Sequence, residues 1–490
     1  MKKTWMSLFA IVFSIGTILS ACSGGTSSGE AAATEGNGEA PDKQAAEPVT
    51  LEFWGRWEEA TAQIQETIAE FQTAYPHITV KYTVVPAAQY IAQMQAAISG
   101  NDLPDLFAYH PNLPASQLVQ MDLLHPISDV VEGKRDAFYE GTWSEGYTTM
   151  NGEAYTLPVF NAMRPSWLMY YNKAVLEKAG LTEADVPKSW DQLYEFSKKV
   201  KEATNGEAYG LVVGVKALSF LPFAIQQMAT SVSPEVSTDS LGYPFNYKTG
   251  KYEYNAAGIV EALELFKKLQ DEKLLHPNSL VMSFREGTAL MEAGQAALTM
   301  DGSFFASQMN KDNLDNYGVA PLPTKDGKPA YTGFYGESRA SIHVAKSTEH
   351  YEEVKLFLQF MMDHLYPKLV KDGIEYSPIK AHNENAEISH PVAAQALKLQ
   401  SEAYILIPRP FERNLETVKV AAELPPKLPK LTLANIVEGY LSGQIPDVKA
   451  ALDQLTEEAN QAFSETIEKV GVQPSDYVFE DWVPFTPYTK

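Results

Sequence analysis

Residues 49–110 read VTLEFWGRWEEATAQIQETIAEFQTAYPHITVKYTVVPAAQYIAQMQAAISGNDLPDLFAYH. Apolar residues occupy alternate positions of 49–53, as in a half-buried strand, and then recur at the spacing of one helix face across 64–75. The β-branched run 78–85 predicts a second strand, and a further helical pattern leads to a third strand at 106–109. This alternation of strands and helices predicts an α/β fold with a parallel sheet.

Aromatic and polar residues follow the first and the third of these strands. Right-handed crossovers bring the carboxyl ends of parallel strands to one edge of the sheet, where ligands of open α/β sheets bind. Flat aromatic rings can pack on the apolar face of a sugar, and polar side chains can bond its hydroxyl groups. We therefore expect a ligand site that includes Trp54, Arg56, Trp57, Tyr109 and His110. The alternatives are that each tryptophan packs in the core and that the loop at 109–110 bonds only to itself.

A second α/β series follows in the middle of the chain. The pattern across 167–215 predicts a strand, a capped helix and another strand. A further apolar strand at 296–300 leads to Asp301 and, shortly after it, Phe304. We expect Asp301 and Phe304 to join the site, although a turn aspartate followed by buried phenylalanines would give the same pattern.

The N-terminus has the features of an export signal. Two lysines precede the apolar run 8–19, which is too short to span a bilayer, and small residues lead to Cys22. This pattern resembles a bacterial lipoprotein signal, which implies a signal peptide at 1–21 and lipidation of Cys22. Residues 22–48 are dominated by small and polar residues, so we expect them to form a disordered tether.

Composition excludes several classes of ligand. The formal net charge is −23, which repels nucleic acid and disfavours a polyanion. Because Cys22 is the only cysteine, the chain can form neither an intramolecular disulfide nor a thiolate metal site, and it contains no H-E-x-x-H pair. We expect no metal and no cofactor, and a neutral, hydroxyl-rich ligand fits the charge best.

Several short motifs occur in an order that resembles one protein family. They are LEFWGRW at 51–57, LPDL at 103–106, LMYYNK at 168–173, SWDQL at 189–193, FREG at 284–287, MDGSF at 300–304, YGVAPLP at 317–323 and GYLSG at 439–443. Each motif is weak alone, but their joint order is specific and covers nearly the whole chain. The sequence resembles the extracellular solute-binding proteins of ABC sugar importers, the family that contains the maltose-binding protein.

The resemblance implies an architecture. It is a two-lobed periplasmic-binding-protein-like fold of type II, in which a ligand cleft lies between lobes joined by a hinge of two to three strands. The N-terminal lobe would comprise 49–158 and 324–370. The C-terminal lobe would comprise 159–323 and 371–490.

The resemblance also adds residues to the expected site. They are Phe160, Asn161, Arg164, Tyr335 and Glu337, and we add Arg409 on its chemistry alone. Arg164 could instead form a structural ion pair, and Arg409, which stands between two prolines, could either bond vicinal hydroxyls or pin a loop. The family's Gly-x-Trp strand end appears here as Gly-Ser-Phe at 302–304, so the resemblance does not imply specificity for maltose.

These observations predict a lipid-anchored substrate-binding protein of an ABC importer that captures a carbohydrate, with an oligosaccharide preferred. We expect a monomeric, non-enzymatic, extracytoplasmic protein, held at the cell membrane by its lipid anchor. Its partners would be the carbohydrate and the transmembrane subunits of the permease. One alternative is the same receptor for an acidic sugar or glycerol phosphate, held by Arg56, Arg164 or Arg409. The other is a secreted glycoside hydrolase with a pair of carboxylates in the cleft.

Overall fold

The computed structural model describes the chain from residue 47 to residue 488. The gaps within this range are 111–112, 140, 162–165, 217–220, 283–285, 310, 335–340 and 385. The expected signal peptide, the lipidation site Cys22 and nearly all of the expected tether lie outside the described residues. Three expected site residues, Arg164, Tyr335 and Glu337, also lie outside them.

The first sheet is built from the opening strand–helix alternation. Strands β1 (Val49–Gly55), β2 (Ile78–Val84) and β3 (Leu106–Ala108) are parallel, with β1 between the other two. Helices α1 (Thr61–Ala74) and α2 (Ala87–Gly100) connect them. The predicted parallel α/β unit is therefore confirmed, and the ends of β1 and β3 lie at the same edge.

Two strands from later in the chain complete this sheet, whose order is β2-β1-β3-β15-β6. Strand β15 (Ser341–Val344) runs antiparallel to β3 and also pairs with β6 (Leu157–Pro158). Helix α9 (Tyr351–Lys371) packs against α1 and β1. The first sheet therefore combines residues that are far apart in the sequence.

The second sheet has the order β13-β7-β12-β8. Its strands are β7 (Trp167–Asn172), β8 (Tyr209–Val212), β12 (Ala296–Gly302) and β13 (Tyr317–Pro321). Strand β12 is parallel to β8 but antiparallel to β7, so that the first residue of β7, Trp167, lies opposite the last residue of β12. Residues from both ends of strands consequently meet at this edge.

Helix α5 (Trp190–Ala203) shows why the second series forms where it was predicted. Ser189 Oγ accepts a hydrogen bond from the Gln192 amide at 3.2 Å, and the Gln192 side chain accepts one from the Ser189 amide at 3.2 Å. This reciprocal capping satisfies backbone donors at the start of the helix. Trp190 and Leu193 on its apolar face are buried in the second core.

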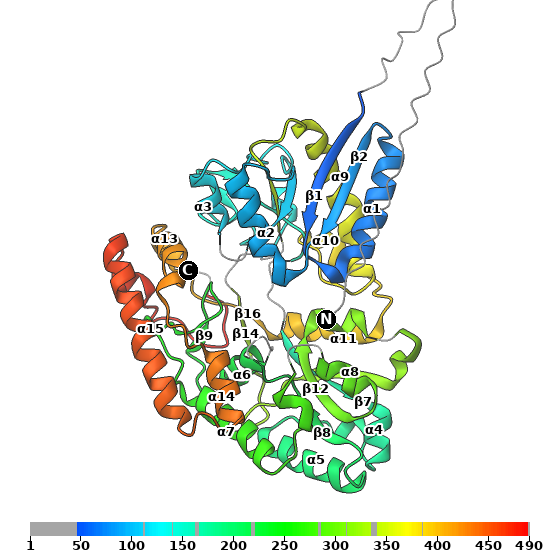
Figure 1. The fold of residues 1–490 in the computed structure, drawn as a ribbon, viewed down its shortest axis with the longest axis vertical. Helices are drawn as coiled ribbons and strands as arrows, with labels where there is room; N and C mark the ends of the chain where they lie inside the picture. Colours follow the sequence, from blue (N-terminus) through cyan, green and yellow to red (C-terminus); the bar gives the residue numbers. More distant parts are fainter. Residues whose placement is uncertain are drawn as a thin grey trace, which may run out of the picture. The chain divides into compact units, whose positions relative to one another are not determined.

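Helices surround both sheets, as Figure 1 shows for α1 and α9 beside β1 and for α4, α5 and α8 around β7, β8 and β12. The remaining helices are α3 (Ala115–Gln120), α4 (Lys173–Lys178), α6 (Leu221–Ala229), α7 (Ala257–Asp271), α8 (Glu286–Glu292), α10 (Lys380–Asn383), α11 (Pro391–Ala403), α12 (Pro410–Arg413), α13 (Thr417–Glu423), α14 (Leu433–Leu441) and α15 (Val448–Val470). The short strands are β4 (Thr149–Met150), β5 (Glu153–Ala154), β9 (Val236–Thr238), β10 (Pro244–Asn246), β11 (Lys251–Tyr252), β14 (Thr332–Phe334) and β16 (Tyr404–Leu406). Within the described ranges, no helix has both the length and the hydrophobicity to cross a membrane.

The chain passes more than once between the apolar cores of the two sheets. Val159 packs in the core of the first sheet, which we call the first core, and Leu168 in one of two cores that line the second sheet. The larger of these two contains Met169 and Trp190, and we call it the second core. After β15 and α9 the first core extends to Ile379, and Val392 belongs to a core of the second sheet. The predicted lobe boundaries at 158, 323 and 370 stay predictions.

Candidate ligand site

The first-sheet side of the site is formed where β1 and β3 end. Arg56 is half-buried, and its guanidinium carbon lies 5.5 Å from the ring centre of Tyr90 and 6.0 Å from that of Tyr109. The Tyr90 hydroxyl donates to the carbonyl of Ala108, and the Tyr109 amide donates to that of Ser341 at 2.8 Å. Arg56 thus lies within cation–π distance of one aromatic ring on α2 and of another that follows β3.

His110 lies next to this group but is fully buried. Burial lowers the pKa of its imidazole, and the nearby charge of Arg56 lowers it further. His110 is therefore a neutral ring that packs in the interior beside the first sheet. The structure therefore brings His110 to the predicted edge without exposing it.

Trp57 and Phe160 pack together near the same edge. Their ring centres are 6.1 Å apart, Trp57 is 5% exposed in the first core, and Phe160 is half-buried. Trp54 is also half-buried and packs against this core. In this structure Trp57 packs in the core, which was the alternative considered for each tryptophan.

Three aromatic rings form the second-sheet side, and we call Trp167, Phe223 and Phe304 the aromatic platform. The rings of Trp167 and Phe223 are nearly parallel, with centres 5.5 Å apart and an angle of 16°, while Phe304 meets Trp167 edge-on at 6.3 Å. Phe223 is 41% exposed, and the other two rings are half-buried. An exposed ring stacked on a second one presents a flat apolar face of the kind that packs against a sugar ring.

The backbone of Trp167 is fixed by one buried side chain. Gln227 on α6 accepts a hydrogen bond from the Trp167 amide at 2.7 Å and donates one to its carbonyl at 3.0 Å. Gln227 itself is buried. These two bonds fix the backbone of Trp167 at the start of β7 to α6, the helix that carries Phe223.

Asp301 has a different environment from the one we expected. It is 1% exposed, and its carboxylate accepts hydrogen bonds from the Gly302 amide at 2.7 Å and from the Thr288 hydroxyl at 3.3 Å. These bonds connect the end of β12 to α8. In this structure Asp301 supports the strand end that carries Phe304 and does not face solvent.

The two sides meet in the structure. The turn η1 (Glu58–Ala60), which follows β1, contacts the turn η5 (Ser303–Gln308), which follows β12. At a crossing of the chain between the two cores, the Asn161 backbone amide donates to the Tyr376 carbonyl at 2.8 Å. Asn161 is buried at this crossing of the chain. The structure thus gathers the strand ends of both sheets around one region.

Arg409 is placed differently. It caps the start of α12, is 7% exposed, pairs with the neighbouring Glu412 and lies 5.9 Å from the ring centre of Phe411. A local pair of this kind matches the alternative that Arg409 pins a loop.

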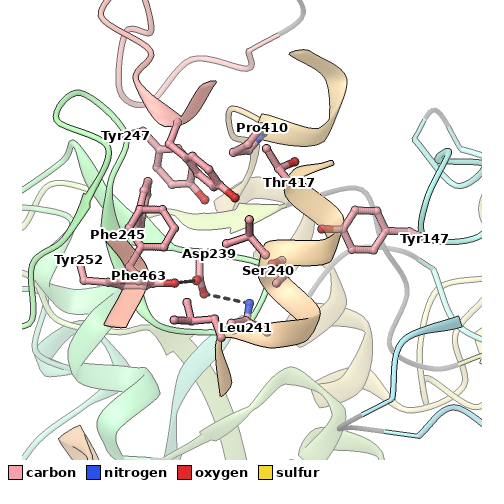
Figure 2. A pocket seen from close by; sticks show the side chains of 14 residues that line it. Tyr147, Asp239, Ser240, Leu241, Phe245, Tyr247, Tyr252, Pro410, Thr417 and Phe463 are labelled. Atoms are coloured by element: carbon pink, nitrogen blue, oxygen red, sulfur yellow. Dashed lines mark hydrogen bonds between the residues drawn. The ribbon is translucent and has the colours of Figure 1, made fainter. Parts of the chain in front are cut away.

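Figure 2 shows a separate cavity lined by aromatic residues. Its volume is about 20 Å³, which is enough for roughly one water molecule. The carboxylate of Asp239 accepts hydrogen bonds from the Tyr252 hydroxyl at 2.7 Å and from the Leu241 amide at 2.9 Å (Figure 2). This cavity is too small for a sugar. In the described ranges, no group of three or more His, Cys, Asp or Glu side chains could hold a metal ion.

Trp167 is not among the site residues that we expected from the sequence. The candidates in the strand–helix series were taken from the carboxyl ends of strands, whereas β7 is antiparallel to β12 and so brings its first residue to the edge where β12 ends. Strand direction is a tertiary property that periodicity does not report. A tryptophan at the start of an otherwise buried strand was the available signal.

Comparisons with known proteins agree with this architecture. A family model described as bacterial extracellular solute-binding protein matches residues 54–364. The sn-glycerol-3-phosphate-binding periplasmic protein UgpB of Rhizobium meliloti is 23% identical over 429 residues, which are 84% of this chain and 94% of that protein.

Solved structures are also similar. Maltose-bound MalE3 of T. maritima superposes with a TM-score of 0.64 at 18% identity, over 84% of this chain and 99% of that one. An ABC substrate-binding protein of Listeria monocytogenes in complex with cycloalternan superposes with a TM-score of 0.62 at 17% identity, over 87% of this chain and 100% of that one. At such identities the likeness shows the fold, which is the α/β fold of the MalE-type periplasmic binding proteins.

Proposed function

Because the chain belongs to the bacterial extracellular solute-binding protein family, we propose that it captures a carbohydrate, preferably an oligosaccharide, between the strand ends of the first and second sheets. The family consists of receptors and not of enzymes. The captured sugar would be delivered to the transmembrane subunits of an ABC permease. A ligand that touches both sides would favour the conformation in which they are close.

The aromatic platform carries this proposal. Large apolar rings are usually buried, yet Phe223 remains 41% exposed while stacked on Trp167. A sugar ring would cover this face and lose little solvation, because the face of a sugar is itself apolar. The sugars named for the similar structures, maltose and cycloalternan, support a carbohydrate ligand.

A second candidate ligand is an anionic one such as glycerol phosphate. Arg56 supports it, because its guanidinium lies over two aromatic rings at the first-sheet edge, and so does the similarity to the glycerol-phosphate-binding protein of R. meliloti. An arginine can bind a phosphate in a bidentate way. Affinity that falls steeply with added salt would favour this ligand over a neutral sugar.

The proposal includes attachment to the membrane. The signal-like residues 1–21 and the cysteine that follows them support lipidation of Cys22 and an extracytoplasmic receptor. Mass spectrometry of the mature N-terminus tests this point. An unmodified Cys22, or a chain that retains residues 1–21, would contradict it.

Two phenylalanines give a matched test of the site. Phe223 and Phe485 are 41% and 43% exposed, and each contacts an aromatic ring, Trp167 at 5.5 Å and Tyr331 at 5.1 Å. A thermal-shift screen of neutral sugars, uronates and sugar phosphates first identifies what raises the melting temperature. We expect Phe223→Ala to weaken binding of the neutral sugar about threefold to tenfold. Phe485→Ala should leave it unchanged, and equal losses in both variants would contradict the platform.

A further inference from the structure

Strand β7 extends one residue beyond its neighbour β13 at the edge that carries the aromatic platform. The register of β13 ends at Pro321, which lies opposite Leu168, so Trp167 is the first residue past this pairing. On the β12 side, the carbonyl of Ser166 accepts a hydrogen bond from the Ser303 amide at 2.9 Å. Backbone groups of successive strand residues point to opposite sides, so those of Trp167 point to the side where β13 has ended.

Gln227 on α6 takes the place of the strand that has ended there. A backbone amide or carbonyl that is removed from water needs a hydrogen-bond partner. The side-chain amide of Gln227 accepts from the Trp167 amide at 2.7 Å and donates to the Trp167 carbonyl at 3.0 Å. The same exchange of two hydrogen bonds joins a bonded pair of antiparallel strand residues. Gln227 therefore acts on the main chain of Trp167 as a strand residue would.

The helix that supplies this amide also supplies the ring that stacks on Trp167. Phe223 lies four residues before Gln227, which is about one helical turn, so both side chains leave α6 on the same face. The Trp167 ring lies 5.5 Å from that of Phe223 at an angle of 16°. One turn of α6 therefore contacts both the main chain and the indole ring of Trp167.

Helix α6 is held in place next to Gln227. An added Cβ at Gly258 on α7 would lie 2.3 Å from the carbonyl oxygen of Ala229, the last residue of α6, so the two helices are in close backbone contact. Gln227 is 7% exposed, whereas Phe223 is 41% exposed. The buried end of α6 thus supports the exposed ring one turn away.

We propose that Gln227 is a positioning residue of the ligand site: by pairing with the main chain of Trp167, it aligns the indole ring with Phe223 to form one flat face for the ligand. The role in a ligand site rests on the proposed function. A gap of about 0.5–1 Å between two surfaces already loses roughly a quarter to a half of their contact energy. A small shift of Trp167 would therefore weaken the packing of a sugar ring on the stack.

Gln226 gives a matched control for Gln227. The two glutamines are neighbours on α6 and both are buried, but the side chain of Gln226 donates to the Pro222 carbonyl of its own helix, at 3.3 Å. Methionine is unbranched like glutamine and lacks the amide, so the same substitution at each position removes the bonds with little change in packing. In calorimetric titration of the full chain with the neutral sugar identified by the thermal-shift screen, Gln227→Met should weaken binding about threefold to tenfold. Gln226→Met should leave the affinity unchanged, and equal losses in the two variants would overturn the inference.

A double variant separates positioning from a general loss of stability. In the Phe223→Ala background the stack is already lost, so Gln227→Met should weaken binding of the sugar much less than it does in the wild type. Losses that multiply fully would show that Gln227 acts independently of the platform and would overturn the inference.

Hydrogen exchange at the Trp167 amide tests the pairing without any ligand. We expect this amide to be protected in the wild type and in Gln226→Met, and its protection to fall about tenfold in Gln227→Met. An unprotected Trp167 amide in the wild type would overturn the inference even if Gln227→Met does not fold. Failure of every ligand in the screen would contradict the proposed function, whereas the exchange result still decides whether Gln227 holds the start of β7.

Discussion

Burial determines how individual polar side chains behave in this protein. His343 on β15 is almost completely buried, its Nδ1 lies 3.5 Å from the Tyr155 carbonyl oxygen, and its ring packs 5.5 Å from that of Phe107. Burial lowers the pKa of His343 to about 4. Glu375 shows the opposite shift, since burial favours the neutral form of both an acid and a base.

The pKa shift of His343 predicts how the stability of the folded chain depends on pH. In the unfolded chain His343 takes up a proton below about pH 6.5, but in the folded chain only below about pH 4, so stability is lost as pH falls through this range. The loss attributable to His343 should approach about 3 kcal/mol. The free energy of unfolding, measured near neutral pH and near pH 4, should therefore fall less in His343→Phe than in the wild type. Equal losses in the two proteins would contradict this contribution.

At the scale of elements, a loop of the first core reaches into the second. Trp143 and Met150 at the two ends of this loop pack against the first core, whereas Tyr147 between them is 5% exposed in the second core. Tyr147 lies 4.7 Å from the ring of Phe411 and lines the cavity of Figure 2. The two cores are therefore connected by the side-chain packing of this loop as well as by the segments of chain that cross between them.

Gly146 shows how closely this loop is packed. It has φ +84, and an added Cβ would lie 2.8 Å from side-chain atoms of both Leu415 and Val418. Gly152 has φ +80 and no atom within 4 Å of an added Cβ, so it is a matched control. Both alanine variants carry the same backbone strain, but Gly146→Ala also overpacks the interface and should unfold about 1–3 kcal/mol more easily. Equal unfolding free energies would show that the loop is not packed as described.

The elements differ in how far the sequence predicts them. Alternation in β1 and the capping pair of α5 are local patterns, and both elements begin close to the predicted residues. The direction of β7 depends on partners more than a hundred residues away, such as Gly302, whose carbonyl accepts a hydrogen bond from Tyr170. The α/β fold was therefore predicted correctly from the sequence, whereas the roles of individual residues in the site stay predictions. Local periodicity carries no information on which strand ends share an edge.

At the scale of the whole molecule, the net charge of −23 bears on the choice of ligand. A negative field repels an anion at long range, so a charged ligand would depend on local cations such as Arg56. A neutral oligosaccharide needs no such compensation and gains from the aromatic platform. The two ligand classes are thus separated by the salt dependence of their binding.

The most direct test of carbohydrate capture is calorimetric titration of the full chain with neutral oligosaccharides of increasing length, at low and at high salt, for the wild type and Trp167→Ala. The account predicts that one neutral series binds with a stoichiometry of one, that salt leaves its Kd unchanged, and that Trp167→Ala weakens it at least about tenfold. Binding of glycerol phosphate or a uronate alone, with a Kd that rises steeply with salt, would contradict it. So would a neutral sugar whose affinity is the same in Trp167→Ala.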